Sequence, residues 1–124
     1  MSVIIETERL ILRTWKEEDA EPYFLINQDP KVIEHLVGPL NLEQIKEFIK
    51  KMELQQQKRG YSLWAVELKK SGKMIGFIGL NYTDWDTPFT PAAEIGWRLG
   101  SQYWGNGYAP EGAKACLKYG FNKI

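Results

Sequence analysis

Two apolar segments in the middle of the chain constrain its fold more than any other feature. Residues 61–68 and 74–82 are rich in β-branched and aromatic side chains, and they flank a five-residue stretch, 69–73. This spacing predicts a β-hairpin. Both segments are apolar at consecutive positions, which is typical of strands that are buried on two faces. We therefore expect a sheet covered on both sides, and Gly76 and Gly79 predict a bulge or a close backbone approach within it.

The first part of the chain predicts a strand followed by a short helix. Residues 9–15 place Leu10 and Leu12 on one side and Ile11 on the other, which predicts a strand. Thr14 and Glu17 have the spacing of a capping box, and Asp19 lies in the first turn of the helix that they would open. This helix should end before Pro30, because a proline disfavours the α conformation in the preceding residue. We expect an irregular stretch from there to residue 39.

Two longer helices and a last strand complete the expected elements. One helix begins after Asn41 and ends at Gly60, and the other runs from about residue 109 to 121. Residues 93–99 alternate in polarity and predict a strand, after a proline-containing loop at 83–91. The order is strand, helix, helix, strand, strand, strand, helix. This order indicates an α/β (α+β) fold in one domain, residues 1–124.

Composition excludes several classes of protein. The 124 residues carry 16 Lys+Arg and 16 Asp+Glu, and this zero net charge argues against a nucleic-acid-binding protein. One cysteine cannot form a disulfide framework, and the acidic first residues do not resemble a signal peptide. No apolar run approaches the roughly 20 residues that span a membrane. We expect a cytoplasmic protein that binds no nucleic acid and no membrane.

A glycine pair between the last strand and the last helix suggests a phosphate site. Residues 102–107 read Gln-Tyr-Trp-Gly-Asn-Gly, and glycines before a helix start turn backbone N–H groups toward an anion. An ordinary glycine turn would give the same pair. A dinucleotide fingerprint would need glycine where Pro110 stands, and a P-loop would need Lys and Ser/Thr after Gly112, where Ala113 and Lys114 follow.

A third pattern fits this stretch. Residues 93–113 resemble the coenzyme A pyrophosphate motif of the GNAT acetyltransferases, Gln/Arg-x-x-Gly-x-Gly/Ala after an exposed strand and before a helix. The opening residues 7–13, Thr-Glu-Arg-Leu-Ile-Leu-Arg, with Asp19 and the pair Asp29-Pro30, resemble the ribosomal-protein N-terminal acetyltransferase (Rim-type) branch. The resemblance implies a mixed, mostly antiparallel sheet with helices on both faces.

The resemblance also implies a cofactor and a site. Acetyl-CoA would be the co-substrate, because family members transfer its acetyl group directly to a primary amine. That acceptor would be a protein N-terminus or a small molecule. No Cys/His cluster in the sequence suggests a metal. The backbone of Trp97, Arg98 and Leu99 would meet the pantetheine arm. The pyrophosphate would be surrounded by Gln102, Gly105, Asn106, Gly107, Tyr108 and Ala109.

Glu94 is the candidate catalytic residue. It matches a position where many family members hold an acid, which would act as a general base directly or through water. A solvent-facing glutamate on a half-exposed strand is the alternative interpretation. Four other residues have simpler interpretations: surface or packing for His35, a small buried hydrophobe for Cys116, and packing anchors for Trp85 and Phe89.

The chain departs from the family at its end. Family members continue with further strands and a helix, which supply the second wall of the cofactor wedge and often a tyrosine that protonates the thiolate. This chain stops at residue 124, where such a strand would begin. Two functions therefore stay open, an N-acetyltransferase and a non-catalytic remnant that binds coenzyme A or associates with itself. In either case we expect a homodimer, because an exposed strand edge recruits another strand.

Overall fold

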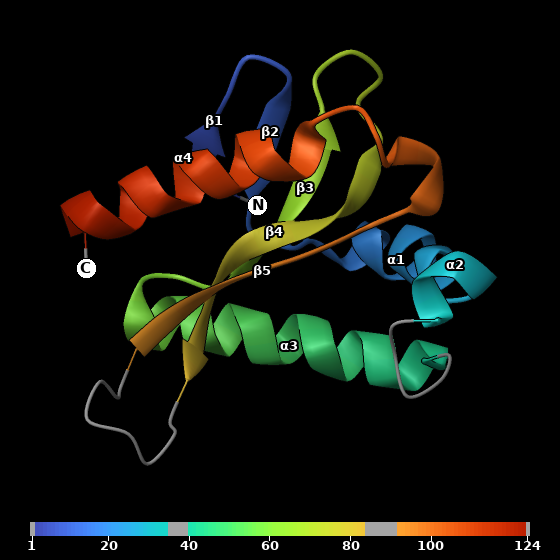
Figure 1. Cartoon of the computed structure of the whole chain (residues 1–124). Coiled ribbons are helices and arrows are strands. Elements are labelled where there is room, and N and C mark those ends of the chain that lie inside the picture. Colours follow the sequence, from blue (N-terminus) through green and yellow to red (C-terminus); the bar gives the residue numbers. More distant parts are fainter. Residues whose placement is uncertain (1, 35–39, 84–91, 124) are drawn as a thin grey trace.

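The structure is a computed structural model, and it describes residues 2–34, 40–83 and 92–123. Its five antiparallel strands form one sheet in which each strand pairs with its neighbour in sequence (Figure 1). The hairpin predicted in the middle of the chain is confirmed, because its two strands pair directly. The strands are β1 (Val3–Glu6), β2 (Leu10–Arg13), β3 (Leu63–Leu68), β4 (Met74–Thr83) and β5 (Ala92–Leu99).

Helices cover both faces of this sheet. Figure 1 shows α4 lying across one face and α3 along the other, with α1 and α2 near the start of α3. No helix in the described ranges is long and apolar enough to cross a membrane. The α-helices among those residues are α1 (Ala20–Ile26), α2 (Pro30–Ile33), α3 (Leu42–Arg59) and α4 (Tyr108–Lys123).

Each face of the sheet has its own buried cluster, as the doubly apolar strands predict. On the α4 side, Trp64 and Ile78 pack with Cys116, and all three side chains are fully buried. On the other side, Phe77 packs against α1 and α3 through Tyr23 and Phe48, whose ring centroids lie 5.4 Å apart. Burying a large apolar side chain stabilises the fold by about 1.5–3 kcal/mol. The two clusters therefore fix the helices on opposite faces.

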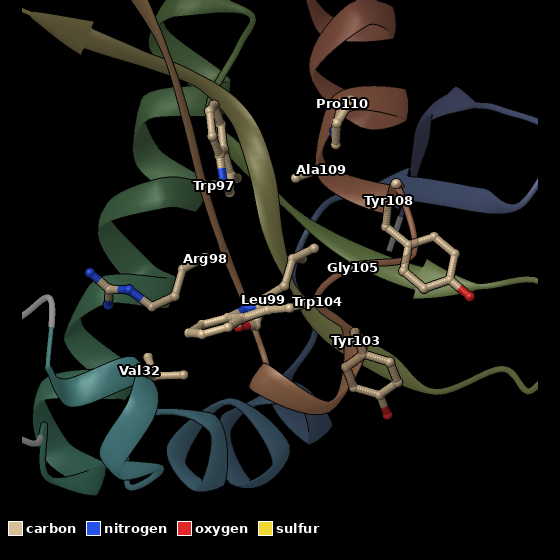
Figure 2. A pocket seen from close by; sticks show the side chains of 11 residues that line it. Val32, Trp97, Arg98, Leu99, Tyr103, Trp104, Gly105, Tyr108, Ala109 and Pro110 are labelled. Carbon is tan, nitrogen blue, oxygen red and sulfur yellow. The ribbon is translucent and has the colours of Figure 1, made fainter.

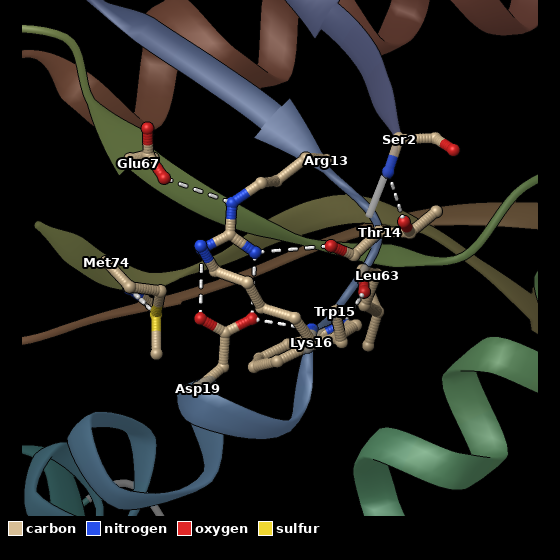
Figure 3. Close-up of polar contacts among 10 residues, drawn as sticks. Ser2, Arg13, Thr14, Trp15, Lys16, Asp19, Leu63, Glu67 and Met74 are labelled. Atoms are coloured by element: carbon tan, nitrogen blue, oxygen red, sulfur yellow. Dashed lines mark hydrogen bonds and ion pairs between the residues drawn. The ribbon is translucent and has the colours of Figure 1, made fainter. Parts of the chain in front are cut away.

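A buried ion pair ties α1 to the sheet (Figure 3). Arg13 at the end of β2 donates from Nη1 and Nη2 to the Asp19 carboxylate, at 2.8 and 2.9 Å. Asp19 also accepts from the backbone N–H of Lys16 at 2.9 Å. The cap predicted for Thr14 and Glu17 is therefore wrong. Asp19 closes the first turn because its carboxylate is held in place by the buried guanidinium.

The start and end of α3 agree with the sequence prediction. Asn41 Oδ1 accepts from the Gln44 N–H at 2.8 Å, and Gln44 Oε1 accepts from the Asn41 N–H at 2.9 Å, which is a reciprocal capping box. Gly60 ends the helix with φ 81°.

Two elements are absent from the sequence prediction. The strand β1 pairs with β2, but its two half-buried residues, Ile4 and Ile5, are adjacent, so no apolar alternation marks it. The helix α2 has only four residues, too few to show a helical period. It begins at Pro30, where an irregular stretch was expected, and Asp29 Oδ1 caps it by accepting from the Lys31 N–H at 3.0 Å.

The strand that carries the candidate site lies at the edge of the sheet. β5 pairs with β4 along its whole length and has no second partner among the described strands. Its backbone approaches Gly76 closely, since a Cβ there would lie 2.0 Å from the Arg98 carbonyl oxygen. Gly76 also has φ 141°, so only glycine fits. The predicted close approach at this glycine is confirmed.

Candidate functional site

A cavity of about 520 Å³ lies between β5 and the start of α4 (Figure 2). Its walls are mainly aromatic and apolar, with backbone of the glycine loop on one side, which suits a ligand with an extended arm and an anionic group. Trp97 and Trp104 are 56% and 44% exposed within it. The residues that line it are Val32, Trp97, Arg98, Leu99, Tyr103, Trp104, Gly105, Gly107, Tyr108, Ala109 and Pro110.

The glycine loop has the geometry of an anion site. Gly105 and Gly107 have φ 80° and 79°, a left-handed conformation that other residues rarely adopt. The Gly107 carbonyl accepts the first bond of α4, from the Glu111 N–H at 3.1 Å. The N–H groups of Tyr108 and Ala109 therefore lie in the first turn, where a helix has no internal acceptor for them. Because the helix dipole also favours negative charge there, the loop can hold a phosphate.

A clamp from the other end of the chain holds this loop. Arg9, just before β2, donates from Nη1 to the Asn106 carbonyl at 2.9 Å, and its guanidinium lies 4.5 Å from the centre of the Tyr108 ring. Its Nε donates to Glu111 at 2.7 Å, and Thr7 Oγ1 donates to the other oxygen of that carboxylate at 2.5 Å. We call Thr7, Arg9 and Glu111 the loop clamp. Sequence reasoning missed it, because its members lie about a hundred positions apart.

The clamp keeps Glu111 ionised. Partial burial opposes ionisation, but hydrogen bonds from Thr7 and Arg9 outweigh it and hold the pKa of this carboxyl below its usual range. Arg9 and Glu111 therefore form an ion pair at the helix start at neutral pH. The carboxylate is turned toward the β1–β2 turn, and the loop N–H groups stay available to a ligand.

The edge of β5 offers backbone groups to the cavity. The Gly100 N–H donates to the Ile75 carbonyl at 3.0 Å, and the Arg98 carbonyl faces Gly76. Because an antiparallel strand alternates, the backbone groups of Trp97 and Leu99 point to the outer edge. One of these is occupied, since Trp104 Nε1 donates to the Leu99 carbonyl at 2.9 Å. Arg98 borders the cavity, and its side chain points away from Tyr108 and Ala109 (Figure 2). Its Nη1 contacts Tyr23 of α1 and Asn27 at the end of that helix.

Three predicted site residues lie outside the cavity lining. Glu94 is exposed near the far end of β5, where it pairs in register with Asn81. Gln102 is exposed and borders a second, smaller cavity with residues of α1. Asn106 is exposed between the two loop glycines, and its Nδ2 donates to the Tyr103 carbonyl at 3.1 Å. The remaining predicted residues all line the cavity.

The remaining candidate residues are either buried in the core or lie outside the described residues. Cys116 is fully buried, and burial raises the pKa of its thiol to about 12, so it is a packed hydrophobe rather than a nucleophile. His35, Trp85 and Phe89 lie outside the described residues. Within the described ranges, no group of three or more His, Cys, Asp or Glu residues is arranged to hold a metal ion.

Comparison with known proteins identifies the family of this chain. Residues 9–124 match the family described as "Acetyltransferase (GNAT) domain". The chain is 34% identical over 118 residues to the "Uncharacterized protein YkkB" of Bacillus subtilis (strain 168), covering 94% of this chain and 67% of that protein. It is 33% identical over 128 residues to the "Uncharacterized N-acetyltransferase YoaA" of the same strain, covering 100% and 70%.

A solved structure shares the fold. RimL, a ribosomal L7/L12 α-N-protein acetyltransferase solved with coenzyme A, matches with a TM-score of 0.75 and 21% identity over 95% of this chain and 67% of that one. The chain thus spans about two thirds of the length of these three proteins.

The fold and the matches define an acetyltransferase domain. The chain belongs to the GNAT acetyltransferase family.

Proposed function

We propose that this protein transfers the acetyl group of acetyl-CoA directly to a primary amine, on a protein N-terminus or a small molecule. One observation carries the proposal: the left-handed glycine loop at the start of α4 opens onto the cavity beside the edge strand β5. Phosphate-binding N–H groups and an unpaired strand edge thus border one space. A pyrophosphate joined to an amide-containing arm matches both features.

The cofactor would lie along β5 with its pyrophosphate on the loop. Backbone N–H groups of residues 105–109 would bind the phosphate oxygens, helped by the dipole of α4. The pantetheine amides would pair with the outward backbone groups of Trp97 and Leu99, as an added strand does. The sequence also predicts this pairing for the backbone of Arg98, but that backbone faces β4 at Gly76, so Arg98 takes no part in it. Gln102 and Asn106 lie outside the cavity lining, and Asn106 would hold the loop through its bond to the Tyr103 carbonyl.

The proposed reaction proceeds without a covalent enzyme intermediate. The neutral amine nitrogen attacks the thioester carbonyl carbon, the C–S bond breaks, and the coenzyme A thiolate leaves and takes up a proton. Outward N–H groups of β5 would stabilise the oxyanion that forms on the carbonyl oxygen. Glu94 would accept the amine proton through water, because it lies exposed on the same strand and outside the cavity lining.

The finer assignment is the Rim-type branch. The residues that carry that resemblance include Thr7 and Arg9, which form the loop clamp, and Arg13 and Asp19, which form the buried ion pair. The fold similarity to RimL supports the same branch. A single free cysteine is compatible with the cytoplasm, where we place the protein.

A transfer assay tests the proposal. The protein is incubated with acetyl-CoA and a panel of primary amines, and the masses of acceptor and protein are measured. We expect acetylated acceptor, equimolar coenzyme A and unmodified protein. An acetylated protein intermediate would contradict direct transfer. Binding of acetyl-CoA without transfer to any amine would favour the non-catalytic module instead.

A further inference from the structure

Arg98 is a half-buried cation with an unusual set of partners. Its Nη1 donates to the Tyr23 hydroxyl at 3.2 Å and to Asn27 Oδ1 at 3.0 Å, and its guanidinium lies 5.5 Å from the centre of the Phe77 ring. Tyr23 and Asn27 are both fully buried. All these partners are neutral, which is uncommon because buried charges are normally paired.

The neutral state of the tyrosine is secure. Burial raises the pKa of Tyr23, although Arg98 opposes this, so the phenol keeps its proton at neutral pH. Its oxygen accepts from Arg98 but carries no negative charge. Asn27 is fixed in turn, because its Nδ2 donates to the Tyr23 carbonyl at 2.8 Å.

Asp29, the carboxylate closest in sequence to Asn27, binds groups other than Arg98. Asp29 accepts hydrogen bonds from the Ser101 hydroxyl and from the Lys31 N–H. Among the described residues, no carboxylate forms an ion pair with Arg98. The guanidinium therefore has a fixed position, a full charge and no counter-ion within that part of the chain.

Arg98 also borders the cavity, on the side opposite the glycine loop. Val32 of α2 lies beside it, and Tyr108 lies across the cavity (Figure 2). Val32 and Arg98 thus mark an end of the cavity that the glycine loop does not line, and a second ligand bound at that end would lie beside Arg98. Nη1 is held by α1, and guanidinium groups have further N–H donors that match a carboxylate.

We propose that Arg98 binds a carboxylate of the acceptor, so that the preferred acceptors are amines that carry a carboxylate group. The acetyl transfer in this inference rests on the proposed function, whereas the binding of a carboxylate by Arg98 does not depend on it. The carboxylate could belong to a free amino acid or to an acidic side chain near a protein N-terminus. Both sources present the same group to the same side chain.

Matched ligands test the inference without turnover. The small pair is N-acetylglycine and N-acetylglycinamide, and the peptide pair is Ser-Asp-Ala-amide and Ser-Asn-Ala-amide. Binding is followed by the ¹⁵N-indole signals of Trp97 and Trp104, which line the cavity. We expect the carboxylate member of at least one pair to bind about tenfold or more tightly than its amide, the size of a hydrogen bond to a charged group. The pair that discriminates identifies the source.

Variants test whether Arg98 causes the preference for the carboxylate ligand. Arg98→Gln should abolish the preference, and Arg98→Lys should retain part of it. Arg59→Gln is the matched control, because Arg59 stacks on Tyr82, outside the cavity lining, and should keep the full preference. Equal binding of both members of both pairs by the wild type would overturn the inference whether or not any variant folds. So would a preference that survives in Arg98→Gln.

A coenzyme A titration of the wild type keeps the two proposals apart. Its failure would contradict the proposed function while the indole titration still reports on Arg98. If Arg98→Gln loses coenzyme A affinity and ligand preference is unchanged, the guanidinium serves the cofactor, and the inference is wrong.

Discussion

Single residues decide whether the loop can hold a phosphate. Gly107 has φ 79°, a backbone conformation that other residues adopt only with strain, while a Cβ there would make an ordinary 3.4 Å contact with Arg9 Nη2. Cys116, by contrast, adds only packing. Sequence reasoning found Gly105 and Gly107 because glycines before a helix are a local signal. It could not find Arg9, whose role depends on a contact across the fold.

Gly107→Val should abolish coenzyme A binding and leave the fold intact. A β-branched residue resists positive φ and blocks close approach to the phosphate. Calorimetric titration measures the affinity. Gly72→Val is the matched control, because Gly72 has φ 73° in the β3–β4 loop, outside the cavity lining, and should keep the affinity. Unchanged affinity in a folded Gly107→Val protein would contradict the phosphate assignment.

Glu94→Gln should lower the turnover rate by roughly a hundredfold or more and spare cofactor affinity, as loss of a general base does. The rate is measured between about pH 6 and 9, across which a general base should shape the profile. Glu47→Gln, an exposed change on α3, is the control. A normal rate in Glu94→Gln would return Glu94 to the solvent-facing interpretation. If the chain shows no turnover, the same pair is compared in a form extended to the length of its relatives.

At the scale of helices and strands, the sequence predicts those elements whose residues carry several agreeing signals, such as end caps and a repeated apolar face. The helix α3 has caps at both ends and an apolar face with Ile45, Ile49 and Met52 buried, so its bounds were predictable. The strand β1 and the helix α2 have four residues each, too few for a signal to repeat. The loop clamp belongs to this scale, since it joins the β1–β2 turn to α4.

The clamp should make stability depend on pH in the acid range. The pKa of Glu111 is lowered in the folded state, so its contribution is full above the ordinary carboxyl pKa of 4.5 and is lost as pH falls through the lowered value. Thermal unfolding of wild type and Glu111→Gln should therefore differ at pH 7 and converge at low pH. A constant difference at all pH values would contradict the clamp.

Arg9→Ala should also weaken coenzyme A binding by about fivefold, the effect of one lost hydrogen bond.

At the scale of the whole molecule, two features of the surface predict association. The strand β5 has one partner in the described sheet, and an unpaired edge is a template for another strand. Trp97 and Leu117, on β5 and α4, are 56% and 51% exposed. Large exposed apolar groups beside an open edge usually mark an interface.

We therefore expect a two-fold dimer at tens of micromolar protein without coenzyme A, measured by light scattering. Because the pantetheine arm would use the same edge of β5, coenzyme A should compete with this association. Trp97→Lys should shift the protein toward monomer, because a lysine at a strand edge opposes pairing. Leu25→Lys is the control, since Leu25 is 62% exposed on α1 and away from β5. A monomeric wild type at these concentrations would contradict the prediction.

Coenzyme A titration of the wild-type chain, followed by thermal unfolding, tests the central claim most directly. A ligand that binds the folded state stabilises it by about 2.7 kcal/mol when present at 100 times its dissociation constant. The glycine loop at the start of α4 predicts such a rise, its saturation with coenzyme A concentration, and its loss in Gly107→Val. A melting temperature that coenzyme A leaves unchanged up to millimolar concentration would contradict a cofactor site between β5 and α4.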